Sequence, residues 1–461
     1  MNILFHNTLT NQKEKFEPIK PGSVKMYNCG PTVYGEQHIG NFSMFVFTDI
    51  LRRTLEYGGL KVKQVINFTD FGHLSGDNEG DADQGEDRMT KGLKREGMAL
   101  TIPNMRILAE KYAKNFLAGL TILNIKTENT EFPYASDYIP DQIKMIGTLL
   151  QKEMAYEGER GVYFDTSKFA DYGKLGNINL KGLAEGARVE KSEKRHLTDF
   201  ILWKKDGRIG WPSPWGLGFP GWHIECSAMI IKLLGEQIDI HTGGIEHIPV
   251  HHNNEIAQSE AATGKKPFSK FWLHRAHLKI DGAKISKSAG NAIYLDDFKT
   301  HSIHPLSFRY WLLTSSYRIP ANFTWEAVSG AQNAFEKIVR TYSEMPKSDK
   351  TDKNIIERFE EAIFDDLNTP VAIALLQEAQ SKSVIDQMDK VLGLNIAKLA
   401  KEITTNIPEE ILDLKAERDS ARAEKNWQKS DELRREIEKE GYILEDKENE
   451  SAIIKKLSSL V

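Results

Sequence analysis

The only two cysteines of the chain, Cys29 and Cys226, are the first residues whose type suggests chemistry. A histidine and a glutamate, His251 and Glu255, lie four residues apart, so a helix would place both on one face. Two thiolates, one imidazole and one carboxylate make a four-ligand set that suits Zn²⁺. Cysteines so far apart in sequence are more often small buried hydrophobic residues, so spacing alone favours that structural alternative.

Two further segments contain residue types that bind phosphate. His38-Ile39-Gly40-Asn41 stands where a loop enters an expected helix, and helix N-termini attract anions. Lys284-Ile285-Ser286-Lys287-Ser288 has two lysines three residues apart in a loop flanked by glycines, and such lysines stabilise a phosphoryl group as charge develops on it. Taken singly, the first segment is better explained by helix capping and the second by an exposed basic turn.

The elements that must position these residues follow the order strand, loop, helix, strand. Residues 24–29 alternate as a strand does, residues 41–57 show helical spacing and end at two glycines, and residues 62–68 form a second strand pattern. A βαβ unit of this kind implies a parallel sheet that binds ligands at the C-terminal ends of its strands. Cys29 and His38 are therefore expected near one rim of the sheet.

The remaining sequence predicts an insertion and a helical C-terminal region. Residues 72–92 are acidic, glycine-rich and without periodicity, which predicts a solvated loop, and their spacing does not match an EF-hand calcium loop. Past residue 305 the pattern is almost wholly helical, and the charges of residues 410–440 suit solvated helix faces. The expected fold class is α/β: a Rossmann-like parallel-sheet domain with an insertion, followed by a helical C-terminal domain. The first half of the sheet domain is expected over residues 1–120 and the insertion over residues 121–205. The second half, with the lysine loop, is expected over residues 206–305, and the helical region over residues 306–461.

The composition is that of a globular chain of 461 residues, with 40% hydrophobic and 28% charged residues, for which two or three domains are expected. No apolar run approaches the length that crosses a bilayer and no N-terminal signal pattern is present, so no membrane contact and a cytoplasmic location are expected. Two cysteines argue against a disulfide framework. A formal net charge of −5 argues against a uniformly basic coat for nucleic acid, but it permits local basic patches.

Together, the His38 and Lys284 segments resemble the HIGH and KMSKS signatures of class I aminoacyl-tRNA synthetases. Other segments are similar to those of the cysteinyl-tRNA synthetase family, and they follow in family order over nearly the whole chain. The segments are Phe5-His6-Asn7-Thr8-Leu9, Tyr27 to Tyr34, Asn67 to Asp70, Phe200 to Lys204, Trp211 to Gly216, Gly221 to Met229, Pro249 to Glu255, Asp366 to Pro370 and Ile443 to Asp446.

The resemblance implies that the thiolate of a substrate cysteine binds to a protein-held zinc ion. Zinc lowers the pKa of a thiol and prefers sulfur to a hydroxyl oxygen, so serine is rejected without an editing site. By this resemblance the zinc ligands are Cys29, Cys226, His251 and Glu255. The residues expected to border the amino acid are Thr32, Thr69 and Trp222, although Trp222 also suits a plain core position.

The resemblance also implies that ATP lies across the histidine and lysine motifs. His38 and Asn41 would stabilise the α-phosphate beside Gly40, and Lys284 and Lys287 would hold the pyrophosphate as the cysteine carboxylate attacks. Mg²⁺ would neutralise the phosphates. The residues expected to contact the adenosine are Gly243, Gly244 and Glu246.

Three departures from the family pattern leave roles open. Glu246 stands where aspartate is expected, and Asn253 stands where glutamate is common but at a position that points away from the metal face. Phe71-Gly72-His73 replaces an acidic pair and a lysine. His73 either contacts substrate or packs, and packing is favoured.

The expected function is the activation of L-cysteine with ATP and its transfer to tRNA(Cys) by a monomer, and class membership suggests the 2′-OH as acceptor. One alternative is a ligase that joins cysteine to a small amine, as enzymes of mycothiol biosynthesis with a similar core do. The segment from Ala416 to Asp446 favours tRNA over that alternative. A non-enzymatic regulator that binds zinc and nucleotide is the second alternative, and intact His38, Lys284 and Lys287 argue against it.

Overall fold

The computed structural model describes residues 2–72, 87–178, 193–285, 290–346, 352–446 and 451–460. The chain forms two compact units. The first comprises Met1–Gln37, Phe47–Thr121 and Lys126–His277, and the second comprises His38–Val46, Ile122–Ile125 and Leu278–Val461. The predicted four-part division stays a prediction.

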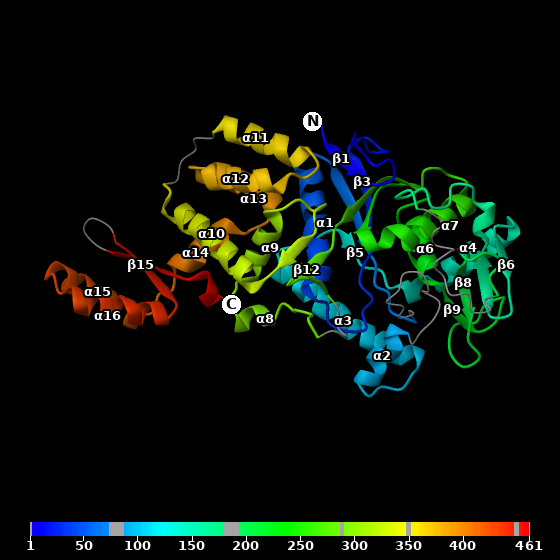
Figure 1. Ribbon diagram of the computed structural model, residues 1–461, viewed down its shortest axis with the longest axis horizontal. Helices are drawn as coiled ribbons and strands as arrows, with labels where there is room; N and C mark the ends of the chain where they lie inside the picture. The colour runs from blue at the N-terminus through cyan, green and yellow to red at the C-terminus, as the bar shows by residue number, and fades with distance from the viewer. Residues whose placement is uncertain are drawn as a thin grey trace. The chain divides into compact units, whose positions relative to one another are not determined.

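A five-stranded parallel sheet forms the centre of the first unit (Figure 1). Its order is β11-β10-β3-β4-β5, so the strand order reverses between β3 and β10. In a sheet of this kind, ligands bind outside the carboxyl ends of the strands at that reversal. The strands are β3 (Ser23–Asn28), β4 (Lys61–Ile66), β5 (Thr130–Glu131), β10 (Ile238–Gly244) and β11 (Ser269–Arg275).

The predicted helix after β3 is present, and it belongs to the first unit from Phe47 onward. This helix, α1 (Ile39–Tyr57), ends at Gly58 and Gly59, and the positive φ of +80° at Gly59 favours glycine there. The expected α/β fold class is thereby confirmed. The other helices of the first unit are α2 (Arg88–Arg95), α3 (Ile102–Ile122), α4 (Ile139–Gln151), α6 (Trp222–Leu233) and α7 (Asn253–Thr263).

Two antiparallel sheets accompany the central one. A hairpin joins β1 (Leu4–Asn7) to β2 (Gln12–Lys15). A four-stranded sheet lies between α4 and α6 in the chain. Three of its strands fall within the predicted insertion at residues 121–205, and the fourth lies beyond it. The strands of this sheet are β6 (Ala155–Glu157), β7 (Gly161–Phe164), β8 (Phe200–Lys205) and β9 (Gly218–Pro220).

The second unit is mainly helical, as the sequence predicts after residue 305. Its helices are α8 (Asp297–Thr300), α9 (Pro305–Leu313), α10 (Trp325–Glu344), α11 (Lys353–Phe364), α12 (Thr369–Glu378), α13 (Lys382–Leu392), α14 (Ile396–Thr404), α15 (Glu409–Ala423) and α16 (Trp427–Lys439). The strands are β12 (Leu278–Ile280), β13 (Ala283–Lys284), β14 (Ala321–Phe323), β15 (Tyr442–Asp446) and β16 (Ser451–Lys455). Within the described ranges, no helix has the length and apolar character needed to span a membrane.

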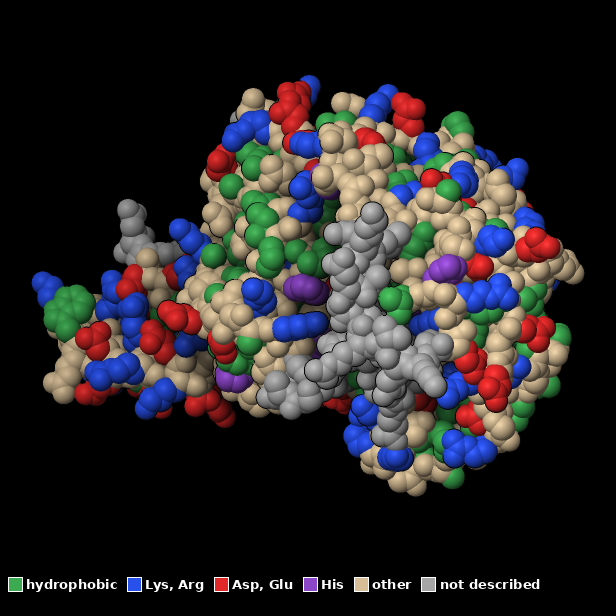
Figure 2. Space-filling view, turned by 45° about the vertical axis from the view of Figure 1, so that its right-hand side comes forward, with side chains coloured by type: hydrophobic (Ala, Val, Ile, Leu, Met, Phe, Trp, Pro, Cys, Tyr) green, Lys and Arg blue, Asp and Glu red, His purple; other side chains and the backbone are tan. Residues whose placement is uncertain are grey.

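Surface charge is mixed on the face that Figure 2 displays. Basic and acidic side chains alternate over the described residues of that face, without a large area of one sign. This arrangement agrees with the near balance of 61 basic and 66 acidic residues in the sequence. Any contact with a polyanion on that face therefore depends on local groups of Lys and Arg.

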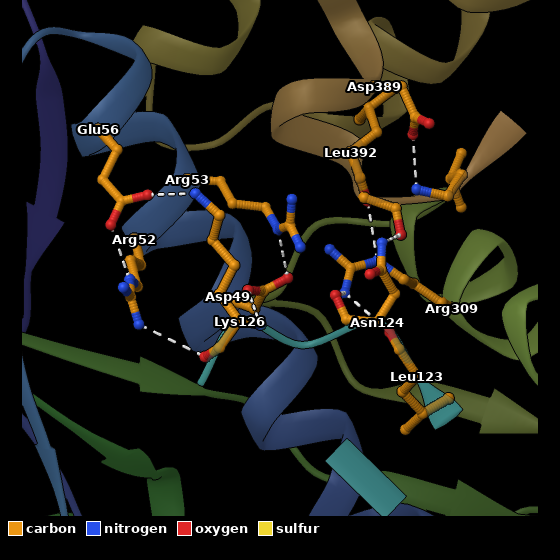
Figure 3. Close-up of polar contacts among 12 residues, drawn as sticks. Asp49, Arg52, Arg53, Glu56, Leu123, Asn124, Lys126, Arg309, Asp389 and Leu392 are labelled. Carbon is orange, nitrogen blue, oxygen red and sulfur yellow. Dashed lines mark hydrogen bonds and ion pairs between the residues drawn. The ribbon is translucent and has the colours of Figure 1, made fainter. Parts of the chain in front are cut away.

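A buried arginine connects three segments of the second unit (Figure 3). Arg309 of α9 is fully buried, and its guanidinium donates to the carbonyl oxygens of Leu392 at 2.8 Å, Leu123 at 3.0 Å and Asn124 at 3.2 Å. Carbonyl groups left buried without a donor are costly to a fold.

Replacing Arg309 with alanine is expected to destabilise the second unit by about 3 kcal/mol, because the substitution leaves buried carbonyl groups unsatisfied and opens a cavity. Differential scanning calorimetry of the full chain measures the effect. Arg318→Ala is the matched control, since the Arg318 side chain is 43% exposed, and its ion pair with Asp366 at the surface is worth less than about 1 kcal/mol. Equal transition temperatures for the two variants would contradict the role assigned to Arg309.

Candidate metal centre and nucleotide-binding motifs

Four predicted metal ligands meet in the first unit. Cys29 directly follows β3, Cys226 lies in α6, His251 lies in the turn Ile248–His252, and Glu255 lies in α7. One ligand atom from each residue lies within 4.8 Å of the other three, and all four residues are buried. The structure thus brings together side chains that are more than 200 positions apart in the sequence.

The sheet topology explains this convergence. Cys29 leaves the C-terminal end of β3, and the chain that leaves β10 forms a wide turn at Ile248–His252 before α7, so both lie at the strand-order reversal. Wide turns of this π-helical kind are frequent at functional sites. Gln258 of α7 donates to the carbonyl oxygen of His223 at 2.5 Å and to Ser227 Oγ at 2.7 Å, and these bonds hold α6 against α7.

The ligands are themselves held by neighbouring side chains. Glu255 Oε1 lies 2.9 Å from His251 Nε2, and Glu255 Oε2 lies 2.9 Å from His241 Nε2. His251 Nδ1 lies 2.9 Å from Nδ1 of His223. His241 and His223 lie outside the set of four, and metal-binding histidines and carboxylates are commonly oriented by such outer contacts. A second set of ligand atoms also lies within 4.8 Å and shares two members with the first: Cys29, His241, His252 and Glu255.

The ionisation of the cluster favours a cation. Burial raises the pKa of Cys29, whereas a hydrogen bond with the Cys29 thiol lowers the pKa of Cys226 to about 6. Burial acts to raise the pKa of Glu255, but His241 and His251 lower it to about 2. Burial acts to lower the pKa of His251, but Glu255 and Cys226 raise it to about 10. Buried negative charges persist when they are paired or bind a metal, so this donor set fits a divalent ion.

The three residues predicted to border the amino acid lie near this cluster. Thr32 and Thr69 form an isolated parallel β-bridge, and Thr69 Oγ donates to Glu225 Oε2 at 2.8 Å. The ring of Trp222 is half-buried, with its centroid 4.3 Å from that of His251. Thr69 and Trp222 therefore contact residues in or next to the ligand set.

Several residues of this site were missed by sequence reasoning. Glu225 and His241 are fully buried, and His247 is partly buried. Among the described residues, Glu225 Oε1 and the Nδ1 atoms of His241 and His247 have no hydrogen-bond partner. His252 Nε2 lies 3.3 Å from Cys29 Sγ. The sequence feature that could have indicated these residues is a group of histidines: four of the 13 in the chain lie between residues 241 and 252.

His38 and Asn41 hold each other at the start of α1. The His38 N–H donates to Asn41 Oδ1 at 3.2 Å, and the Asn41 N–H donates to His38 Nδ1 at 3.3 Å. Because His38 Nδ1 accepts a hydrogen bond, the neutral ring carries its proton on Nε2. An imidazole N–H and an amide NH₂ thus accompany a helix N-terminus, which is a suitable arrangement for binding phosphate.

The glycine of this motif and the beginning of the lysine motif are close together in the second unit. A Cβ added at Gly40 would lie 2.8 Å from Ile285 Cδ1. Lys284 is exposed on β13, and its carbonyl oxygen accepts from Asn291 Nδ2 at 3.1 Å. Lys287 lies outside the described residues.

Gly243 and Gly244 end β10 in the first unit, and Glu246 follows them. A Cβ at Gly243 would lie 2.5 Å from His252 Cε1 and 2.6 Å from His247 Nδ1, so a larger residue does not fit there. This observation gives a packing reason for Gly243 beside the predicted approach of adenine.

The structure describes the surroundings of two residues that depart from the family pattern, Phe71 and Asn253. Phe71 is buried, with its ring centroid 5.0 Å from that of Trp211, whereas His73 and most of the acidic loop lie outside the described residues. Asn253 exchanges hydrogen bonds with the backbone of Leu175 and donates to the carbonyl oxygen of Ile248. Its amide is therefore occupied by backbone groups.

The fold is similar to that of solved tRNA synthetases. The structure of Mycobacterium tuberculosis methionyl-tRNA synthetase in complex with methionyl-adenylate matches with a TM-score of 0.58 and 12% identity, and the match covers 82% of this chain and 90% of that chain. At this identity the likeness concerns the fold alone. It agrees with the parallel sheet and its reversal of strand order, which this chain shares with the fold of class I tRNA synthetases.

Sequence comparison extends the likeness to nearly the whole chain. Residues 15–333 match the family model of the class I (C) tRNA synthetase catalytic domain. "Cysteine--tRNA ligase 1" of Burkholderia lata is 40% identical over 97% of this chain and 95% of its own length. "Cysteine--tRNA ligase" of Treponema denticola is 39% identical over 97% and 98%, respectively. The chain therefore belongs to the class I (C) tRNA synthetase family.

Proposed function

We propose that this protein activates L-cysteine with ATP, forming cysteinyl-adenylate and pyrophosphate, and then transfers the cysteine to the 3′-terminal adenosine of tRNA(Cys). The observation that carries the proposal is the convergence of two buried thiols, His251 and Glu255 at the strand-order reversal. The relatives named cysteine–tRNA ligase, which align over nearly their full length, support it.

The proposed metal is zinc, held by Cys29, Cys226, His251 and Glu255. A zinc ion in this position would bind the substrate thiolate in preference to the hydroxyl group of serine. The choice of zinc rests on the two sulfur donors, because magnesium and calcium prefer oxygen ligands. Thr32, Thr69 and Trp222 would border the rest of the amino acid.

The proposed activation step is an attack of the cysteine carboxylate on the α-phosphate of ATP, with pyrophosphate as the leaving group. His38 and Asn41 would donate hydrogen bonds to the α-phosphate, where negative charge increases in the transition state. Lys284 and Lys287 would attract the leaving pyrophosphate, together with Mg²⁺. Gly40 would allow the backbone to approach the phosphates, while Gly243, Gly244 and Glu246 would bind the adenosine.

The proposed tRNA-binding region is the helical part, residues 306–461, and acylation of the 2′-OH is expected. Helix α16 begins at Trp427, which directly follows Lys425 and Asn426 in the chain. The side chain of Trp427 is 59% exposed. An exposed aromatic ring near a basic side chain suits stacking with an unpaired RNA base. We also propose that the protein acts as a monomer in the cytoplasm, where cysteines needed as thiolates stay reduced.

Cysteine-dependent exchange of pyrophosphate into ATP tests the proposed activity. Exchange is expected with cysteine and at least about 10⁴-fold less with serine, because the hydroxyl oxygen is a poor zinc ligand. Aminoacylation of tRNA with a cysteine anticodon then separates a tRNA ligase from one that joins cysteine to a small amine. Absence of exchange, or equal exchange with serine, would refute the proposal.

A further inference from the structure

The carboxylate of Glu246 folds back over the backbone of Gly244. A Cβ added at Gly244 would lie 2.2 Å from Glu246 Oε2 and 2.3 Å from both Cδ and Oε1. These distances are far below van der Waals contact, so the carboxylate occupies the space that a side chain at position 244 would fill. Gly244 has an ordinary φ of −77°, which any residue adopts. A side chain at position 244 would therefore displace the Glu246 carboxylate from this place.

A histidine just beyond the end of the adjacent strand lies close to the same carboxylate. Gly244 and Arg275 are paired residues at the ends of β10 and β11, and His277 follows Arg275 by two positions. His277 Nδ1 lies 3.5 Å from Glu246 Oε2, with 37% of the histidine side chain and 40% of the glutamate side chain exposed. The carboxylate thus has the backbone of Gly244 on one side and the imidazole of His277 near one of its oxygens.

We infer that His277 is a positioning residue for the nucleotide, because it holds Glu246 where that carboxylate accepts a hydrogen bond from a ribose hydroxyl of ATP. The inference rests on the proposed binding of adenosine by Glu246. A glutamate has one more rotatable bond than the aspartate expected at this position, so it loses more rotamer freedom when it binds a ligand. The contact with the imidazole and the position of the carboxylate over the Gly244 backbone restrict the rotamers of Glu246 before ATP binds.

The contribution of this half-exposed contact at 3.5 Å is modest, because even an ion pair on a protein surface is worth less than about 1 kcal/mol. Removal of the imidazole should therefore weaken ATP binding by a factor of about three to five, without altering catalysis at saturating ATP. A change in KM without a change in kcat separates positioning of the nucleotide from damage to the fold.

Calorimetry measures the Kd of ATP, and cysteine-dependent exchange measures the KM and kcat for ATP. The proteins compared are wild type, His277→Ala, His277→Gln, Glu246→Gln, and the double variant that combines His277→Ala with Glu246→Gln. His277→Ala should raise Kd and KM about three- to fivefold. His277→Gln, which keeps a hydrogen-bond donor, should restore most of the affinity. The double variant should match Glu246→Gln, because His277 acts through that carboxylate. His196→Ala is the matched control, since His196 is also an exposed histidine near a carboxylate, 3.9 Å from Asp165.

Deoxynucleotides distinguish this role from a general effect. With 2′-deoxy-ATP or 3′-deoxy-ATP, whichever lacks the hydroxyl that Glu246 binds, wild type and His277→Ala should have equal Kd values. Unchanged ATP affinity in His277→Ala, or an equal loss with ATP and both deoxy forms, would overturn the inference. If the wild-type protein binds ATP but shows no exchange, the proposed function is refuted, while calorimetry still tests the role of His277. If the wild-type protein does not bind ATP, both the proposed function and the role of His277 are refuted.

Discussion

Cys226→Ser is expected to release the metal and to abolish cysteine activation. Serine replaces a thiolate donor with a hydroxyl group that stays protonated, so the affinity for zinc should fall by at least about 100-fold. Cysteine-dependent exchange should fall by a similar factor or more, because the substrate thiolate loses its binding partner. Metal analysis of the purified protein, combined with the exchange assay, measures both effects.

Histidine variants determine which of the two overlapping ligand sets holds the ion. His251 belongs only to the set with Cys226, whereas His252 belongs only to the set with His241. His251→Ala should therefore lose zinc, as Cys226→Ser does, while the matched control His252→Ala should retain it. The opposite pattern, with zinc lost from His252→Ala and kept by His251→Ala, would place the ion in the second set.

His38→Ala is expected to lower the kcat of adenylate formation by about 10²- to 10³-fold, the usual cost of losing one donor to a developing negative charge. The structure supports this because Nδ1 of His38 accepts from the Asn41 N–H, so the neutral imidazole donates through Nε2. Single-turnover measurement of cysteinyl-adenylate separates this step from product release.

Zinc content provides the control for the His38 variant. His38 belongs to neither ligand set, so His38→Ala should keep wild-type zinc and nearly wild-type binding of cysteine. His196→Ala serves as a histidine-to-alanine control outside the proposed site. A loss of zinc in His38→Ala, or a rise in KM with unchanged kcat, would contradict a role in stabilising the transition state.

Local sequence patterns were sufficient for the elements with long or alternating apolar runs. The strand at residues 24–29 and the helix that ends at Gly58 agree with β3 and α1 within two residues. The two-residue strand β5 (Thr130–Glu131) was missed, because its place in the sheet depends on pairing with β4 and it has no pattern of its own. The pair β15 and β16 was missed within a region whose charged helices dominate the pattern.

The sequence by itself determined the chemical types available to the site: two cysteines in the entire chain, a histidine and glutamate one helical turn apart, and a glycine-containing motif at a helix start. Only the tertiary structure decided which of them meet. Adjacent residues His251 and His252 both turn toward the cluster, because the wide turn before α7 brings both rings to the same side. Strand order determines the approach of Cys29 to Cys226, since β3 and β10 are neighbours only through pairing across more than 200 residues. Such pairing depends on the burial of the whole sheet, which local periodicity does not encode.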